Sequence, residues 1–353
     1  MDHWTQSEPL KQPLEGIETI HNCVLYAART HGTKKALGWH DVVDIIKEEK
    51  EVTKNVGGKE VKETKKWKYF QLSNYKYLNY LEVQEAVSEV ARGLVDLGVT
   101  ADDTFNVYAS TSLNWQLVAH TCASISTAIA TAYDLLGEAG QTHSLNELNC
   151  GGVYTDAELL PVLAKVIGNT PSLRIVIYSG EAKPSVLDSI QQMRENIQPL
   201  SPDTTKDRFP TPSSVACIMY TSGTTSAPKG IVITHSDAIA VIGTLYKLLG
   251  HHFNTDDAFL AYLPLTHILK YIVELCLFFV GMTIGYGRIK TLTDQSIRGC
   301  SGDMVAFKPT IMVGVPAVWE LIWKGIVSQV QSGGAVTKSV FSGALTPAPS
   351  QVQ

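Results

Sequence analysis

The stretch VACIMY-TSGTTSAPKG-IVITH occupies residues 215–235 and is the most informative segment of the chain. Its apolar ends, residues 215–220 and 231–235, read as two strands that bracket a loop. The loop is rich in Ser, Thr and Gly and carries Lys229. Backbone N–H groups, hydroxyls and an ammonium group all bind phosphate oxygens, and Gly223 permits close approach of a ligand. The stretch therefore predicts a phosphate-binding loop between two strands.

The order of residues in this loop excludes two common enzyme classes. A Walker-type loop, G-x-x-x-x-G-K-[ST], would need glycine where Pro228 stands and Ser or Thr where Gly230 stands. The chain also lacks the G-x-S-x-G elbow of serine hydrolases. An exposed Ser/Thr turn without a ligand is the alternative interpretation at this point.

Upstream of the loop, helical and strand patterns alternate. Residues 80–97 repeat apolar positions at helical spacing and are followed by Gly98, which is typical of a helix end. A strand is expected at residues 104–110, a helix from about 114 to 130, a strand at 152–155, a helix at 158–168 and a strand at 174–179. Such alternation predicts an open α/β architecture, with a parallel sheet covered by helices.

Three further segments bear on the organisation of the chain. Residues 47–68 are dense in charge around Gly57 and Gly58, which favours an exposed hairpin. Residues 196–214 are rich in Pro, Ser, Thr and Asp and predict a linker. Residues 271–287 are apolar over about the minimum length of a membrane span, but they include Glu274 and several glycines, so a buried helix and strand are expected.

Length and composition limit the remaining possibilities. With 353 residues the chain is expected to form two folding units or one large α/β unit. A net charge of -5 argues against a nucleic-acid partner. Six cysteines without a C-x-x-C pair, and an N-terminus without a secretory pattern, predict an intracellular protein.

Residues 220–230, YTSGTTSAPKG, closely resemble the signature YTSGTTGxPKG of the acyl-adenylate-forming superfamily. The resemblance implies that the loop holds the β- and γ-phosphates of ATP. It assigns this role to Thr221, Ser222, Gly223, Thr224, Thr225 and Lys229. It also makes Lys229 and Thr224 candidate catalytic residues, with Thr224 as the candidate Mg²⁺ ligand.

Segments on both sides of the loop narrow the resemblance to long-chain fatty acyl-CoA synthetases, and with the upstream residues 67–94 and 132–147 the fungal branch is the nearest match. Residues 261–279, AYLPLTHILKYIVELCLFF, are similar to the family motif LPLAHILE, which places His267 in the acyl and nucleotide pocket as a third candidate catalytic residue. The alternative is a satisfied core histidine. Residues 307–326 continue the resemblance and place Gly314, Val315 and Pro316 near an acyl tunnel. Similarity extends over most of residues 15–343.

The resemblance implies an α/β fold, the large N-terminal domain of an adenylate-forming enzyme, with stacked mixed sheets covered by helices. We expect residues 1–75 to form an N-terminal region with the charged hairpin. Residues 76–205 and 206–353 would then form two α/β subdomains. The implied activity is an ATP-dependent long-chain fatty acid–CoA ligase that uses ATP, Mg²⁺ and CoA. Two intracellular locations stay open: peripheral contact with the surface of the endoplasmic reticulum, a peroxisome or a lipid droplet, since lipid delivers the substrate, and otherwise the cytoplasm.

Three features depart from the family pattern. Ser226 replaces a loop glycine, and Lys270 replaces the usual Glu, a reversal that is harmless if its side chain points to water. The chain also ends before the family's magnesium-binding Glu, ribose-binding Asp and C-terminal lid, so an incomplete form is expected. The alternatives are a non-catalytic nucleotide- or acyl-binding remnant and an acyl-AMP ligase that serves a carrier-protein thiol.

Overall fold

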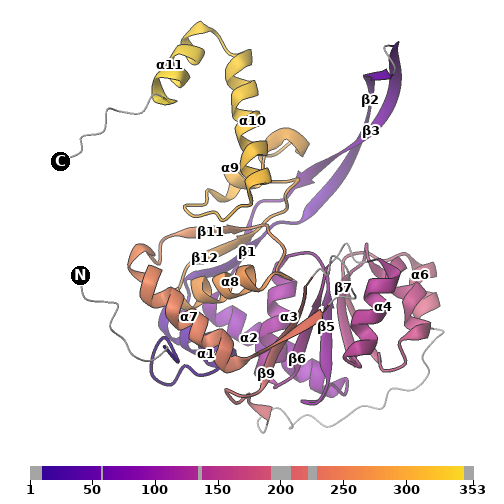
Figure 1. Cartoon of the computed structure of the whole chain (residues 1–353), viewed down its shortest axis with the longest axis vertical. Coiled ribbons are helices and arrows are strands. Elements are labelled where there is room, and N and C mark those ends of the chain that lie inside the picture. The colour runs from indigo at the N-terminus through magenta and orange to yellow at the C-terminus, as the bar shows by residue number, and fades with distance from the viewer. Residues whose placement is uncertain (1–9, 57–58, 134–136, 192–207, 222–228, 346–353) are drawn as a thin grey trace.

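The computed structural model describes residues 10–56, 59–133, 137–191, 208–221 and 229–345 of the chain. Its larger sheet has the strand order β10-β9-β6-β5-β7-β8 (Figure 1). Neighbouring strands are parallel except for β10, which pairs antiparallel with β9. The strands are β5 Thr104–Tyr108, β6 Ala128–Ala132, β7 Gly152–Asp156, β8 Ile175–Ser179, β9 Val215–Thr221 and β10 Lys229–Thr234.

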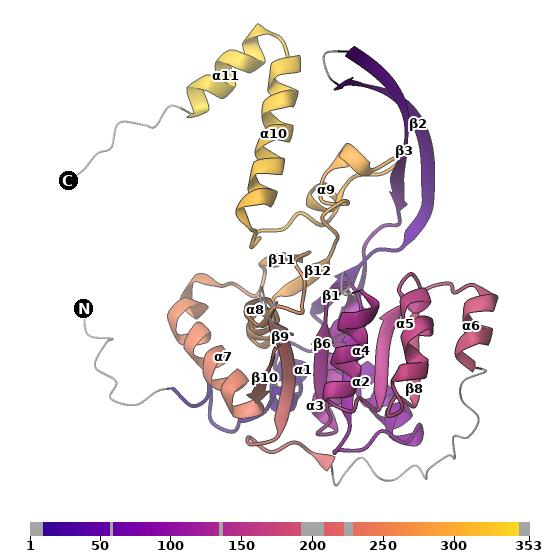
Figure 2. The ribbon, with the colours of Figure 1, turned by 45° about the vertical axis from the view of Figure 1, so that its right-hand side comes forward.

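A second sheet has four strands in the order β11-β12-β1-β4. β1 pairs parallel with β12 and antiparallel with β4, so this sheet is mixed. A separate ribbon of two antiparallel strands, β2 and β3, extends from the body on the same side as α10, with α9 between the two in the view of Figure 2. The bounds are β1 Lys35–Trp39, β2 Val42–Val56, β3 Lys59–Leu72, β4 Lys76–Asn79, β11 Ala258–Ala261 and β12 Thr283–Tyr286.

Helices cover the sheets in layers. One apolar core joins both sheets through α1 Ile20–His31, α2 Tyr80–Asp96, α3 Leu113–Ser124, α7 His235–Leu249 and α8 Ile268–Val280. A second core lies under α4 Glu138–Glu147 and α5 Leu160–Val166, with α6 Pro184–Gln191 beside them. A third joins α9 Asp303–Phe307 and α10 Pro316–Ser332 to β11, and α11 Ala335–Leu345 follows. The short 3₁₀ helices are η1 Ile167–Asn169, η3 Gly250–His252 and η4 Asp294–Ser296.

Most predicted elements are confirmed, including the α/β class and the mixed sheets covered by helices. The charged hairpin is the β2–β3 ribbon, and α2 ends just before Gly98, whose φ of +86° suits glycine. The helix expected over residues 114–130 is wrong at its C-terminal end. It stops at Ser124, and β6 begins at Ala128. Ser126 adopts a positive φ of 58° between them, which breaks the helical path.

The apolar segment at residues 271–287 forms a buried helix and strand, as expected. α8 ends at Gly281, which has a φ of +96°, and β12 begins two residues later. A Cβ at Gly281 would lie 2.4 Å from the His31 ring, so the turn requires glycine for space as well as for conformation. Among the described helices, none combines the length and apolar content needed to cross a bilayer.

The expected domain boundaries at residues 75/76 and 205/206 stay predictions. Sheet pairing crosses both of them, because β1 bonds to β4 and β9 bonds to β6. The expected linker lies largely outside the described residues. Hydrogen bonding in the sheets therefore does not separate the chain at those points.

Candidate functional site

The C-terminal ends of parallel strands meet at one edge of the six-stranded sheet. β5, β6, β7 and β9 all end there. α3 and α4, which follow β5 and β6, belong to different apolar cores on the two sides of this sheet. The helix that follows β5 therefore covers one face of the sheet, and the helix that follows β6 covers the other. In open α/β sheets a ligand crevice forms where the connections switch faces in this way.

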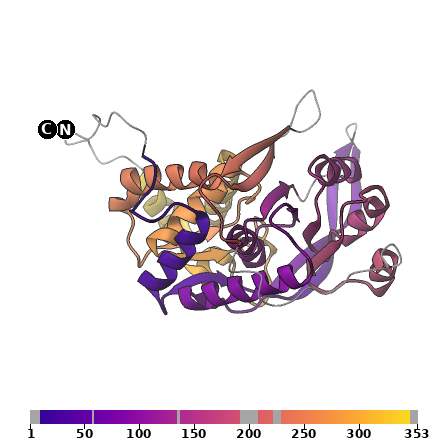
Figure 3. The ribbon, with the colours of Figure 1, turned by 90° about the horizontal axis from the view of Figure 1, so that it is seen from below.

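A pocket of about 190 Å³ lies at this edge, between the β9–β10 hairpin and the start of α8. β9 and β10 run side by side to the rim of the body (Figure 3). The lining residues are Tyr133, Met219, Tyr220, Ile231, Ile233, Thr266, His267 and Ile268. The pocket therefore brings His267 next to Tyr220, the residue before the predicted phosphate loop.

His267 is exposed and immediately precedes α8. The Tyr133 hydroxyl lies 3.1 Å from His267 Nε2 and 3.3 Å from Nδ1, with the two rings nearly perpendicular. Burial raises the pKa of Tyr133, so its phenol stays protonated and can donate to the imidazole at neutral pH. The alternative of a buried core histidine is wrong, because His267 faces the pocket and solvent.

The predicted phosphate loop is described only at its two ends. Thr221 is the last residue of β9 and pairs with Lys229, the first residue of β10. Lys229 is exposed. Ser222, Gly223, Thr224, Thr225 and the substituted Ser226 lie outside the described residues. The structure therefore places the loop ends beside the His267 pocket, and the roles of the inner residues stay predictions.

Gly314, Val315 and Pro316 do not line this pocket. Ile311 bridges Phe259 of β11, and Pro316 begins α10. A Cβ at Gly314 would lie 2.7 Å from both Tyr262 Oη and Trp319 Nε1. Glycine at this position therefore lets α10 approach Tyr262 closely.

A neighbouring pocket of about 400 Å³ shares Thr266 with the first. Its lining includes Ile45, Lys68 and Phe70 from the ribbon, Ser110 and Thr111 after β5, Tyr262, and Gly287, Arg288 and Lys290 after β12. Three cationic side chains against one acid, Glu158, favour anionic ligands here. The two pockets adjoin at Thr266 and are together called the groove: Tyr220 and His267 line one part of it and the ribbon lines the other.

Sequence reasoning missed Tyr133, Thr111 and Arg288. Tyr133 directly follows β6, and Arg288 comes two residues after β12. Ligand-binding residues gather at the carboxyl ends of parallel strands, so this position could have identified both. Thr111 holds the 263–265 segment, because its hydroxyl donates to the Leu263 carbonyl at 2.9 Å and accepts from Leu265 N–H at 2.8 Å. These two bonds therefore fix the backbone that leads into Thr266.

Lys270 does not point to water. Its side chain is 5% exposed and forms an ion pair with Glu274, which is fully buried. Glu274 also accepts a hydrogen bond from Tyr286 Oη at 3.1 Å. The charge reversal at position 270 therefore has a partner inside the protein.

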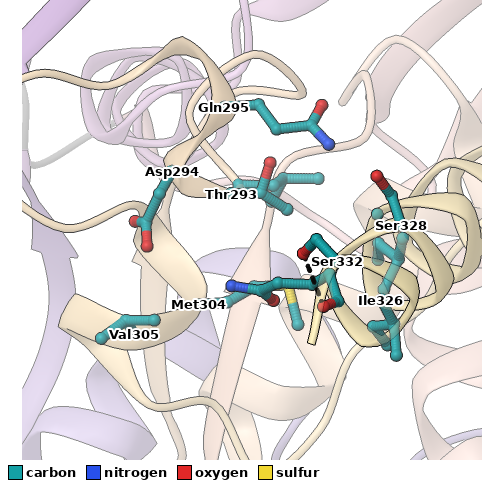
Figure 4. Close-up of a pocket in the computed structure, with 12 residues that line it drawn as sticks. Thr293, Asp294, Gln295, Met304, Val305, Ile326, Ser328 and Ser332 are labelled. Atoms are coloured by element: carbon teal, nitrogen blue, oxygen red, sulfur yellow. Dashed lines mark hydrogen bonds between the residues drawn. The ribbon is translucent and has the colours of Figure 1, made fainter. Parts of the chain in front are cut away.

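A larger pocket of about 540 Å³ lies elsewhere, between α10 and the segment that carries η4 and α9. Figure 4 shows Thr293, Asp294 and Gln295 on one side of it and Ile326, Ser328 and Ser332 on the other. Its one charged lining residue is Asp294, which disfavours a phosphate ligand. The groove at the strand ends is thus the better candidate for nucleotide binding.

Within the described ranges, no group of three or more His, Cys, Asp or Glu side chains could hold a metal ion. Mg²⁺ in nucleotide sites is commonly held by one or two protein ligands together with substrate phosphates. The residues at the groove are compatible with that arrangement, and Thr224 stays the predicted ligand.

Comparison with curated proteins finds fungal relatives along nearly the whole chain. Long-chain-fatty-acid–CoA ligase 1 of Schizosaccharomyces pombe is 40% identical over 336 residues, covering 93% of this chain and 49% of that protein. Long-chain-fatty-acid–CoA ligase 1 of Saccharomyces cerevisiae is 36% identical over 372 residues, covering 95% and 52%. The chain therefore spans about half the length of these relatives.

Solved structures share the fold at low identity. A long-chain-fatty-acid-CoA ligase from Archaeoglobus fulgidus aligns with a TM-score of 0.62 at 17% identity, covering 94% of this chain and 57% of the other. The adenylation domain of a carboxylate reductase from Mycobacterium chelonae aligns at 0.67 and 16%, covering 92% and 51%. The family model described as AMP-binding enzyme matches residues 59–349. The chain therefore belongs to the AMP-binding enzyme family.

Proposed function

We propose that this chain carries the nucleotide-binding part of an ATP-dependent long-chain fatty acid–CoA ligase. In this reaction a carboxylate oxygen of the fatty acid attacks the α-phosphorus of ATP and displaces pyrophosphate. The thiolate of CoA then attacks the acyl carbonyl and displaces AMP. ATP, the fatty acid and CoA are the proposed substrates.

The observation that carries this proposal is the meeting of the loop ends and His267 at one edge of the sheet. Thr221 and Lys229 pair across the hairpin, and Tyr220 lines the same pocket as His267. The fungal relatives are named long-chain-fatty-acid–CoA ligases, which supports the acyl substrate. Preorganised donors at this edge would offset the charge that develops on the transferring phosphate.

Each predicted residue has a proposed role in this arrangement. Lys229 and the loop hydroxyls of Thr221, Ser222, Thr224 and Thr225 would bind the β- and γ-phosphates, with Gly223 giving the backbone room. Mg²⁺ would neutralise charge on the triphosphate when bound. His267, oriented by Tyr133, would contact the reacting groups in the pocket. Gly314, Val315 and Pro316 would border the acyl chain.

Calorimetric titration of the 353-residue protein with MgATP tests the nucleotide site directly. We expect saturable binding by the wild type and at least roughly tenfold weaker binding by Lys229→Ala, because a charged phosphate contact is lost. Lys247→Ala, on α7 away from both pockets, is the matched control and should bind normally. Equal affinity of wild type and Lys229→Ala would contradict the assignment.

ATP–pyrophosphate exchange with palmitate or oleate tests the chemistry. Exchange above the Lys229→Ala level supports the ligase, and CoA-dependent release of AMP supports the second half-reaction. ATP binding without exchange would instead support a non-catalytic remnant. Acyl-AMP formation that CoA fails to consume would support transfer to a carrier-protein thiol.

We also propose an intracellular location, either peripheral at the surface of the endoplasmic reticulum, a peroxisome or a lipid droplet, or otherwise cytoplasmic. The reason is that a long-chain acyl substrate partitions into lipid. Fractionation of cells that express the tagged chain tests this proposal. Recovery in a secreted fraction would contradict the intracellular location, and absence from every membrane and droplet fraction would contradict the peripheral association and leave the cytoplasm.

A further inference from the structure

A buried polar network crosses the junction between α8 and the four-stranded sheet. Lys270 pairs with Glu274 one helical turn later, and the Glu274 carboxylate accepts from Tyr286 Oη on β12. The Lys270 ammonium also lies 4.4 Å from the centre of the Phe259 ring on β11. Lys270 and Glu274 are 5% and 0% exposed. The network therefore links one turn of α8 to two neighbouring strands.

Each element in this network leads directly into the groove. β11 ends at Ala261 and continues into Tyr262, Leu265 and Thr266. β12 ends at Tyr286 and continues into Gly287 and Arg288. The first turn of α8 is closed by the bond from Tyr271 N–H to the His267 carbonyl at 3.0 Å. Lys270 stands three residues after His267, so the two residues share that turn.

Stability alone does not account for a buried ion pair at this position. Removing two charges from water is costly, and apolar pairs of similar volume are often equally or more stable. Removing one partner, by contrast, leaves a buried charge without compensation and is strongly destabilising. The directional bonds to Glu274 and the contact with the Phe259 ring fix how the first turn of α8 is rotated about the helix axis. An apolar pair would not fix this rotation as closely.

We propose that Lys270 is a positioning residue, which together with Glu274 fixes the first turn of α8 so that Thr266 and His267 face the nucleotide pocket. The proposal rests on the proposed function of that pocket. It also gives the charge reversal at position 270 a structural purpose.

The double variant Lys270→Met/Glu274→Leu separates positioning from stability. Both replacements are apolar and close in size to the original side chains, so we expect the double variant to melt closer to the wild type than Lys270→Met alone, which leaves the buried Glu274 charge unpaired. We expect at least roughly tenfold weaker MgATP binding by the double variant, because small displacements of site residues are costly. The His267 imidazole NMR signals, assigned with His267→Gln, should also shift.

The matched control is Lys324→Gln/Glu320→Gln, which neutralises an exposed pair of the same spacing on α10 and should change neither readout.

A folded double variant with unchanged His267 signals would overturn the proposal. Should that variant fail to fold, Tyr286→Phe removes one bond to Glu274 and should give smaller shifts in the same direction, and no shift would again overturn it. The NMR readout does not need ATP. A wild type that binds no ATP would therefore count against the proposed function while the positioning test still gives its answer.

Discussion

At the scale of single residues, the pair of His267 and Tyr133 makes the clearest prediction. His267 is exposed, so His267→Ala should leave the melting temperature nearly unchanged. Loss of a group that contacts the reacting atoms should lower the ATP–pyrophosphate exchange rate by roughly tenfold or more. Tyr133→Phe removes only the hydroxyl that lies 3.1 Å from Nε2 and should give a smaller loss. Wild-type exchange in His267→Ala would remove this residue from the site.

Gly314 offers a second prediction at this scale. A Cβ there would lie 2.7 Å from Tyr262 and Trp319, so Gly314→Val should displace one of these side chains. Overpacking of this kind costs about 1–3 kcal/mol in the free energy of unfolding. Gly334→Ala is the control, because nothing lies within 4 Å of the added atom. Chemical denaturation of both variants measures the difference, and equal stability would show that the contact is easily relieved.

At the scale of elements, Thr111 connects the end of β5 to the loop before α8. Thr111→Val keeps the shape but loses the bonds to the Leu263 carbonyl and Leu265 N–H. We expect a stability loss of about 1 kcal/mol and faster hydrogen exchange in residues 263–267. Thr244→Val, which loses a bond within α7, should leave exchange in that loop unchanged. Unchanged loop protection in Thr111→Val would mean that other contacts hold the loop.

Local patterns predicted most elements correctly where the signal was strong. The hairpin with alternating charges, the amphipathic α2 and the apolar α8 and β12 each match the expected segment closely. The expected helix over residues 114–130 was too long because residues 125–132, ISTAIATA, contain no Gly, Pro or charged residue that would mark a helix end. The positive φ at Ser126 separates α3 from β6. Serine does not by itself predict such a backbone conformation.

The candidate site was less predictable than the elements around it. The motifs pointed to His267 and the loop ends because those residues belong to short contiguous signatures; the structure brings them to one edge of the sheet, and their roles stay predictions. Tyr133, Thr111 and Arg288 come from distant parts of the chain, and only the packing of the two sheets brings the ends of β6, β5 and β12 together. The burial of Lys270 was unpredictable for the same reason, since Tyr286 and Phe259 lie on other strands.

For the whole molecule, two buried histidines predict how stability depends on pH. His235 Nδ1 accepts the Ile20 N–H at the start of α1, 3.2 Å away, so the neutral ring caps that helix. Burial, with a smaller repulsion from His21, lowers the pKa of His235 to about 4 and that of His120 to about 3. In the unfolded chain both return to about 6.5, so the unfolded state binds more protons between these values.

The stabilisation that comes from the two neutral histidines should therefore be fully present above pH 6.5. The free energy of unfolding should fall as the pH drops toward 4. Each histidine contributes at most about 1.4 kcal/mol per pH unit within that window. Urea unfolding at pH 7 and pH 5 measures the loss. His235→Gln, whose amide oxygen can still accept from Ile20 N–H, should lose less stability between these pH values than the wild type. Parallel losses in both proteins would mean that His235 takes up no proton on unfolding, and that other groups, such as His120 or carboxylates, cause the acid sensitivity.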